Sequence, residues 1–88
     1  MRKSKYQPLE KHLLSLRFSR WEASFDEIEK ILGFQLPKSA NTHPEWWANE
    51  NPDVTTHSHC KAWVCVGWKT ENVNLTNQKL VFFKVAQE

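Results

Sequence analysis

Glycine, cysteine and long apolar runs are all scarce in this 88-residue sequence. Two glycines are too few for a glycine-rich loop that wraps a nucleotide phosphate, so we expect no such site. No segment approaches the roughly 18 consecutive apolar residues that a membrane-spanning helix needs. The first residues are basic but lack the apolar stretch of a secretory signal. We therefore expect a cytoplasmic protein that makes no contact with a membrane.

A chain of this length is expected to form one domain, residues 1–88, with residues 1–5 as a flexible basic N-terminus. So short a chain buries only about 60% of the surface that it exposes when unfolded, so its large apolar side chains are needed in the core. Charge is uneven: residues 1–20 carry six Lys and Arg against one acid, whereas residues 21–55 carry seven acids against two lysines. A basic end attracts phosphate, and an acidic middle attracts basic partners.

Two helices are predicted in the first half of the chain, over residues 8–17 and 25–32. A proline suits the opening position of the first helix, and leucines follow it at helical spacing. Ser24 and Glu27 have the spacing of a capping box, and Gly33 suits a left-handed helix end. The intervening segment RWEAS is short and has the composition of an extended segment.

A third helix is predicted to begin at Pro37, after the four-residue break FQLP. With the helix before it, this segment has the proportions of a helix-turn-helix pair. Pro44 would interrupt the third helix, because a proline there removes a backbone hydrogen bond and clashes with the preceding turn. Two interpretations remain open: residues 38–42 form a short turn and the helix starts near Pro44, or one longer helix is kinked.

The segment HSHCKAWVCVGW suits either a helix or a strand by composition. Apolar residues recur in it at helical spacing, so a helix over residues 57–66, stopped by Gly67, is the prediction. Residues 68–75 and 79–85 are predicted to form an antiparallel hairpin. The predicted fold is thus one small α+β domain. Three or four short helices, including the helix-turn-helix-like pair, pack on a C-terminal β-hairpin or a three-stranded antiparallel sheet, in an order that would resemble a winged helix.

Four ligand-type side chains, His57, His59, Cys60 and Cys65, lie within nine residues. Structural zinc takes four such ligands in a tetrahedron, usually in pairs carried by separate elements. A single short segment does not readily wrap a tetrahedron, so we expect no metal and interpret both cysteines as free, buried thiols. No motif for an oxyanion hole or an orienting third residue accompanies the cysteines, so a non-enzymatic protein without a cofactor is expected.

The five tryptophans are expected to lie mainly in the core, because each buries a large area and a small domain needs that burial. Trp46 and Trp47 would point about 100° apart on a helix, so at most one of them points straight inward. The other is predicted to be partly exposed and is the best aromatic contact residue. We assign that role to Trp47.

Five stretches of the chain carry a resemblance to a family: KYQPLEKHLLSL, SFDEIEKILGFQLPKSA, HPEWWAN, KAWVCVGW and VNLTNQKLVFFK. They resemble a family of small uncharacterised bacterial or phage domains with the pattern KYxPL, FxEIExILGxxLPxSA, WWAN, AWxxxGW and a closing hairpin. The match runs from Lys5 to Lys84. The resemblance implies a domain that is helical first and ends in a hairpin, and it implies no activity.

The favoured hypothesis is a nucleic-acid-binding module, with DNA as the ligand, that uses the basic N-terminal region and the third helix. Polar residues of that helix and of the matching blocks supply the predicted contacts: Lys5, Tyr6, Lys38, Ser39, Asn41, His43, Trp47 and Asn49. The alternative is a protein-interaction module, such as a phage or mobile-element inhibitor or accessory subunit, whose acidic middle contacts a basic partner.

Overall fold

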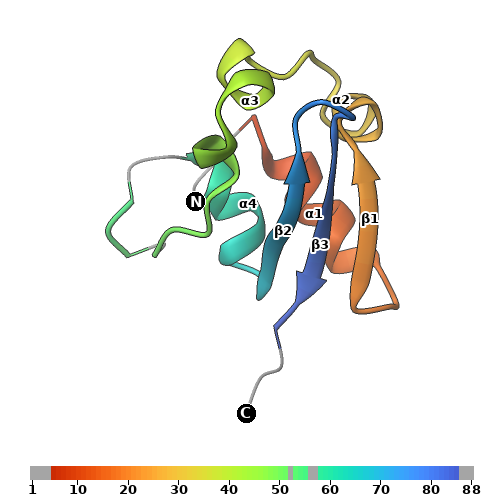
Figure 1. Ribbon diagram of the computed structural model, residues 1–88. Coiled ribbons are helices and arrows are strands. Elements are labelled where there is room, and N and C mark those ends of the chain that lie inside the picture. The colour runs from red at the N-terminus through yellow and green to blue at the C-terminus, as the bar shows by residue number, and fades with distance from the viewer. Residues whose placement is uncertain (1–4, 52, 56–57, 86–88) are drawn as a thin grey trace.

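The computed structural model describes residues 5–51, 53–55 and 58–85. In this part of the chain, four α-helices pack with a three-stranded antiparallel sheet in a small α+β domain (Figure 1). The elements are α1 (Gln7–Ser15), β1 (Arg20–Ser24), α2 (Phe25–Leu32), α3 (Lys38–Thr42), the 3-10 helix η1 (Pro44–Trp47), α4 (Ser58–Val64), β2 (Trp68–Asn74) and β3 (Lys79–Lys84). The predicted fold class is confirmed.

The sheet has the order β1-β3-β2, so the last strand of the chain lies in the middle. The predicted hairpin is present as β2 and β3, and the extended segment RWEAS becomes β1 along the other side of β3. The register places Trp21 and Thr70 on either side of Phe82, and these side chains face the helices. Neighbouring residues on each strand point to the opposite side of the sheet, where Val81 of the central strand is still buried.

Helix α2 begins and ends as local chemistry predicts. The Ser24 hydroxyl accepts a hydrogen bond of 3.0 Å from the Glu27 amide, and the Glu27 carboxylate accepts one of 2.9 Å from the Ser24 amide. These two bonds satisfy donors that the first turn of a helix leaves unpaired. Gly33, with φ of 85°, ends the helix in the left-handed conformation that suits glycine. The predicted range, residues 25–32, is confirmed.

Pro44 divides the region that was predicted as the third helix. Helix α3 covers only Lys38–Thr42, and η1 starts at Pro44 itself. The first of the two open interpretations is right about the break before Pro44 and wrong about the elements, because residues 38–42 form a short α-helix and the element that starts at Pro44 is a 3-10 helix of four residues. The helix predicted over 57–66 is confirmed as α4, which is followed by Gly67 at φ of 82°.

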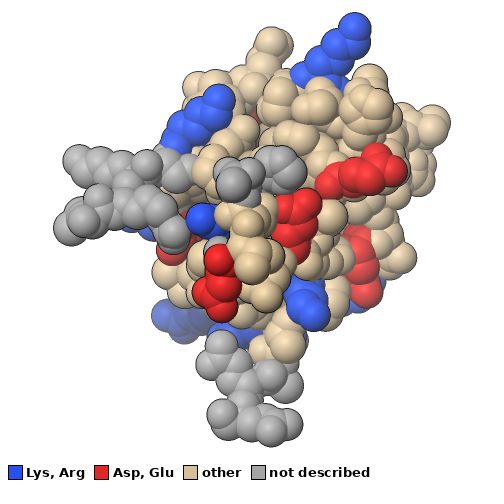
Figure 2. Space-filling model, turned by 90° about the vertical axis from the view of Figure 1, so that its left-hand side faces the viewer, with Lys and Arg blue, Asp and Glu red and all other residues tan. Residues whose placement is uncertain are grey.

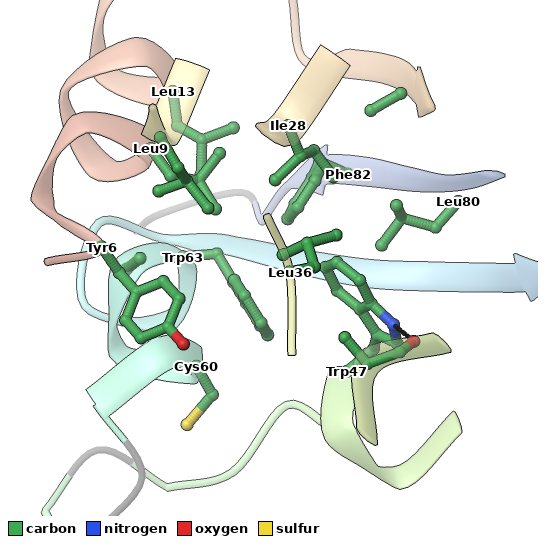
Figure 3. Packing of buried hydrophobic residues seen from close by; sticks show 14 of the residues in the cluster. Tyr6, Leu9, Leu13, Ile28, Leu36, Trp47, Cys60, Trp63, Leu80 and Phe82 are labelled. Carbon is green, nitrogen blue, oxygen red and sulfur yellow. Dashed lines mark hydrogen bonds between the residues drawn. The ribbon is translucent and has the colours of Figure 1, made fainter. Parts of the chain in front are cut away.

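The core is built around tryptophans, as predicted. The side chains of Trp47, Trp63 and Trp68 are 1%, 0% and 1% exposed, and they come from η1, α4 and β2. Figure 3 shows the first two rings beside leucines of α1 and residues of β3. The Trp63 ring lies 5.9 Å from the Trp47 ring and 5.7 Å from Phe82, measured between centroids. These contacts join the helices to the sheet.

The capping box yields a stability prediction. Ser24→Ala removes the hydroxyl that accepts from the first turn of α2, so it lowers the free energy of unfolding by about 1 kcal/mol. Ser15→Ala is the matched control, because the Ser15 hydroxyl only donates to the His12 carbonyl at an exposed helix end. Urea denaturation followed by tryptophan fluorescence compares the two variants. If both variants lose the same free energy of unfolding, the assignment of Ser24 as the helix cap is contradicted.

Candidate functional site

The side chain of Asn49 joins the loop after η1 to the sheet. Strand β2 is an edge strand, and the amide and carbonyl of Thr70 point away from β3. The Asn49 Oδ1 accepts from the Thr70 amide at 2.8 Å, and the Asn49 Nδ2 donates to the Thr70 carbonyl at 3.0 Å. The side-chain amide thus occupies the place that a neighbouring strand would take.

The same oxygen of Asn49 also holds the central tryptophan. The Trp63 indole N–H donates to the Asn49 Oδ1 at 3.1 Å, so the buried ring has a partner for its polar atom. The Thr70 hydroxyl donates to the Trp47 carbonyl at 2.5 Å. The Trp47 indole N–H donates to the Ala40 carbonyl at 2.9 Å. This network fixes η1 between α3, α4 and β2.

With Trp47 turned inward, its neighbour Trp46 lies partly buried at the surface. The Trp46 ring stacks on the His59 ring at a centroid distance of 3.9 Å and an interplanar angle of 5°. The His59 Nε2 lies 2.8 Å from the Trp46 carbonyl oxygen, and the Tyr6 ring meets both rings edge-on. The stack borders an open hollow of about 400 Å³, the α3–α4 hollow, lined by Ser39, His43, Glu45, Trp46, Glu50 and His59.

Some predicted contact residues gather around the α3–α4 hollow. Ser39 and His43 line it, and Lys38 is exposed beside Ser39 on the same short helix. The Lys5 Nζ lies 5.5 Å from the centroid of the Tyr6 ring and 5.4 Å from that of Phe34, within the range of a cation–π interaction. Tyr6 in turn contacts both rings of the stack, so Lys5 is linked to the stack through Tyr6 but does not line the hollow.

Of the other predicted contact residues, Trp47 and Tyr6 are buried, whereas Asn49 is exposed and Asn41 is half-buried, and both have side-chain amides that are engaged within the protein. The assignment of the exposed ring to Trp47 is corrected, because Trp47 is 1% exposed and Trp46 is the outer ring. Tyr6 is only 6% exposed, and burial raises the pKa of its hydroxyl. The amide of Asn49 is engaged with β2, as described above. Asn41 donates to the Pro37 carbonyl and accepts from Gln78, so its amide faces the β2–β3 turn.

Sequence reasoning did not predict the two stacked rings of the hollow, Trp46 and His59, as contact residues. Trp46 was expected only as an alternative to Trp47, since the angle between adjacent residues indicates that one ring is outside but not which one. His59 was considered only as a metal ligand. Its stacking on Trp46 links η1 to α4 across the loop between them, and no spacing rule in the sequence predicts such a contact.

The residues considered for zinc separate in the structure. His57 lies outside the described residues, and His59 is stacked on Trp46. Cys60 is buried, as predicted, whereas Cys65 is exposed, which corrects that part of the prediction. Across residues 5–51, 53–55 and 58–85, no group of three or more His, Cys, Asp or Glu side chains is arranged to hold a metal ion.

Burial raises the pKa of the Cys60 thiol, and the nearby charge of Glu50 adds to this effect. The Cys60 Sγ lies 4.0 Å from a carboxylate oxygen of Glu50. A thiol beside a carboxylate stays protonated at neutral pH, whereas a nucleophilic cysteine needs a cationic neighbour that favours the thiolate. The surroundings of Cys60 therefore favour a structural role.

The fold and its surface thus define a small α+β domain with an aromatic-lined hollow between α3 and α4. The chain belongs to the family described as "Domain of unknown function (DUF7662)", whose model matches residues 6–86. No curated protein and no solved structure matches the chain. In the ranges that the structure describes, no helix is both long and apolar enough to cross a bilayer.

The Asn49 network yields a second prediction. Asn49→Ala leaves the Trp63 indole N–H and the Thr70 amide without their acceptor, so it lowers the free energy of unfolding by about 2–4 kcal/mol. Asn41→Ala is the matched control: its amide bonds to the Pro37 carbonyl and to exposed Gln78, and its loss costs at most about 1 kcal/mol. Urea denaturation measures both variants. A loss for Asn49→Ala no larger than that for Asn41→Ala would refute the role of the network.

Proposed function

We propose that this domain is a non-enzymatic nucleic-acid-binding module, with DNA as the ligand, and that the α3–α4 hollow is the contact surface. A bacterial or phage origin and a cytoplasmic location belong to the same proposal. The observation that carries it is the stacked pair of Trp46 and His59, which borders the hollow beside Ser39 and His43. Aromatic rings that border a hollow among polar and cationic side chains are typical of surfaces that stack bases.

Two exposed lysines support the phosphate contacts of this proposal. Lys5 lies near the stack through its contact with the Tyr6 and Phe34 rings, and Lys38 lies next to Ser39. Lysine side chains that neutralise phosphates release counterions from nucleic acid, which makes the affinity depend on salt. The order of elements also favours this function, because β1 pairs with the C-terminal hairpin as expected of a winged helix.

The length of α3 bears on which form of DNA binds. With five residues, α3 has little more than one turn, so it presents few side chains to a major groove. Stacking on Trp46 requires an unpaired base, because bases in a duplex are already stacked on one another. We therefore expect single-stranded DNA to bind more tightly than a duplex of the same sequence.

A second candidate function has an observation in its favour. Glu45 and Glu50 line the same hollow, and acidic side chains lie among the basic ones on this side of the molecule (Figure 2). Carboxylates repel phosphate and attract cations. A protein-interaction module that binds a basic segment is therefore the alternative. Glu45 distinguishes the two functions, because removing its charge would strengthen the binding of DNA and weaken the binding of a basic segment.

The test is fluorescence anisotropy of a labelled single-stranded oligonucleotide and its duplex at several salt concentrations. Lys38→Ala and Lys5→Ala weaken binding about 3–10-fold and reduce the salt slope by about 1, because each removes one phosphate contact. Lys69→Ala is the matched control, since Lys69 is an exposed lysine on the opposite face of the sheet and its loss leaves the affinity unchanged.

Glu45→Gln strengthens oligonucleotide binding under the first proposal, because it removes a repulsive charge from the hollow. Under the alternative, Glu45→Gln instead weakens binding of a lysine-rich peptide, and the oligonucleotide does not bind at low salt. Absence of oligonucleotide binding at low salt, or an equal effect of Lys69→Ala, would overturn the first proposal.

A further inference from the structure

Two large apolar side chains are exposed near the end of α1, one on the helix itself and one on the segment that joins α1 to β1. Leu14 is 61% exposed and Phe18 is 55% exposed. In so small a domain, where apolar side chains are needed for the core, exposure of two of them close together in the chain indicates a binding surface. Leu14 also lines an open groove of about 660 Å³, and Ser19, the residue after Phe18, lines it as well.

This groove, the α1–β3 groove, shares no residue with the α3–α4 hollow. Its other lining side chains come from α1, the turn before β2, the start of β2 and the end of β3: Leu13, Val66, Trp68, Lys84 and Val85. Backbone hydrogen bonds join the segments that line the groove. The Lys84 amide donates to the Ser19 carbonyl at 2.7 Å, and the Val85 amide donates to the Gly67 carbonyl at 2.7 Å.

The charges near the α1–β3 groove are mainly positive. Lys84 lines the groove, and Lys11 and Arg17 are exposed three residues before and after Leu14. Lys11 lies on the same side of α1 as Leu14, because the two are three positions apart on the helix, whereas Arg17 follows the end of the helix in the segment before β1. Glu10, one turn before Leu14, is the one acid between residues 7 and 20. The groove therefore combines an apolar floor with a basic border.

We infer that the α1–β3 groove binds an acidic amphipathic segment of another protein. Apolar side chains of that segment fill the groove over Leu14, and its carboxylates meet Lys84, Lys11 and Arg17. Helices that place an apolar face in a groove and charges at its border are a recurrent mode of peptide recognition. The interaction goes beyond the proposed nucleic-acid binding, because it takes place at a separate surface and its ligand is recognised by apolar side chains as well as by negative charge.

The chemistry of the groove disfavours two other occupants. A nucleic acid would meet an apolar floor, and the Trp68 ring is 1% exposed and offers no face to a base. A second copy of this chain carries its densest acidic run on α2, at Asp26, Glu27 and Glu29. The apolar side of α2 is buried in its own core, so that helix has no apolar face to place in the groove.

The probe for this inference is a fluorescein-labelled synthetic peptide of about 14 residues, with Leu and Phe at positions i, i+3, i+4 and i+7 and glutamate elsewhere. Anisotropy is measured with the full chain. The acidic peptide binds, whereas a version with lysine for glutamate and a version with serine for the apolar residues do not. Leu14→Glu and Lys84→Glu each weaken binding about tenfold or more, which is the effect of losing one central contact.

Val54→Glu is the matched control, because Val54 is 76% exposed and does not line the groove, so binding stays within about twofold. Leu14→Glu also leaves oligonucleotide binding unchanged, which separates this test from that of the proposed function. The inference is overturned if the acidic peptide does not bind, if the lysine version binds equally, or if Leu14→Glu has no effect. Self-association of the chain that Leu14→Glu abolishes would assign the groove to a second copy and likewise overturn it.

Discussion

The outer edge of β2 exposes the amide and carbonyl of Thr70, and the side chain of Asn49 supplies a partner for each of them. An unpaired sheet edge is a site where other chains can add, so natural proteins protect it, and here a side-chain amide does so at Thr70. The same amide oxygen accepts from the indole of Trp63. One residue therefore pairs the outward backbone groups of Thr70 and fixes the polar atom of the ring at the centre of the core.

The position of Asn49 determines the character of the surface next to it. Because Asn49 holds the end of η1 against β2, Trp47 two residues earlier is turned into the core, where its indole reaches the Ala40 carbonyl. Trp46 is then left at the surface, where His59 of α4 covers one face of its ring. The α3–α4 hollow is thus a consequence of how the core is closed, and its aromatic border is held by buried hydrogen bonds.

Local features of the sequence predicted much of the fold. The capping box at Ser24 and the stop at Gly33 give α2 its bounds because both act within a few residues. The hairpin and α4 follow in the same way from alternation and helical spacing. The site was predicted less well: the hydrogen bonds of Asn49 to β2 were not predicted, and Trp47 was expected to be the outer ring. Asn49 bonds to Thr70 and Trp47 bonds to Ala40, and these contacts form only when the chain is folded.

Hydrogen exchange at the Thr70 amide, resolved by NMR, tests the role of Asn49 most directly. If Asn49 substitutes for a missing strand, this outward-facing amide exchanges within a factor of about ten of the Phe82 amide in the central strand, and Asn49→Ala removes that protection. Exchange at the rate of an open sheet edge in the unmodified protein would contradict the account.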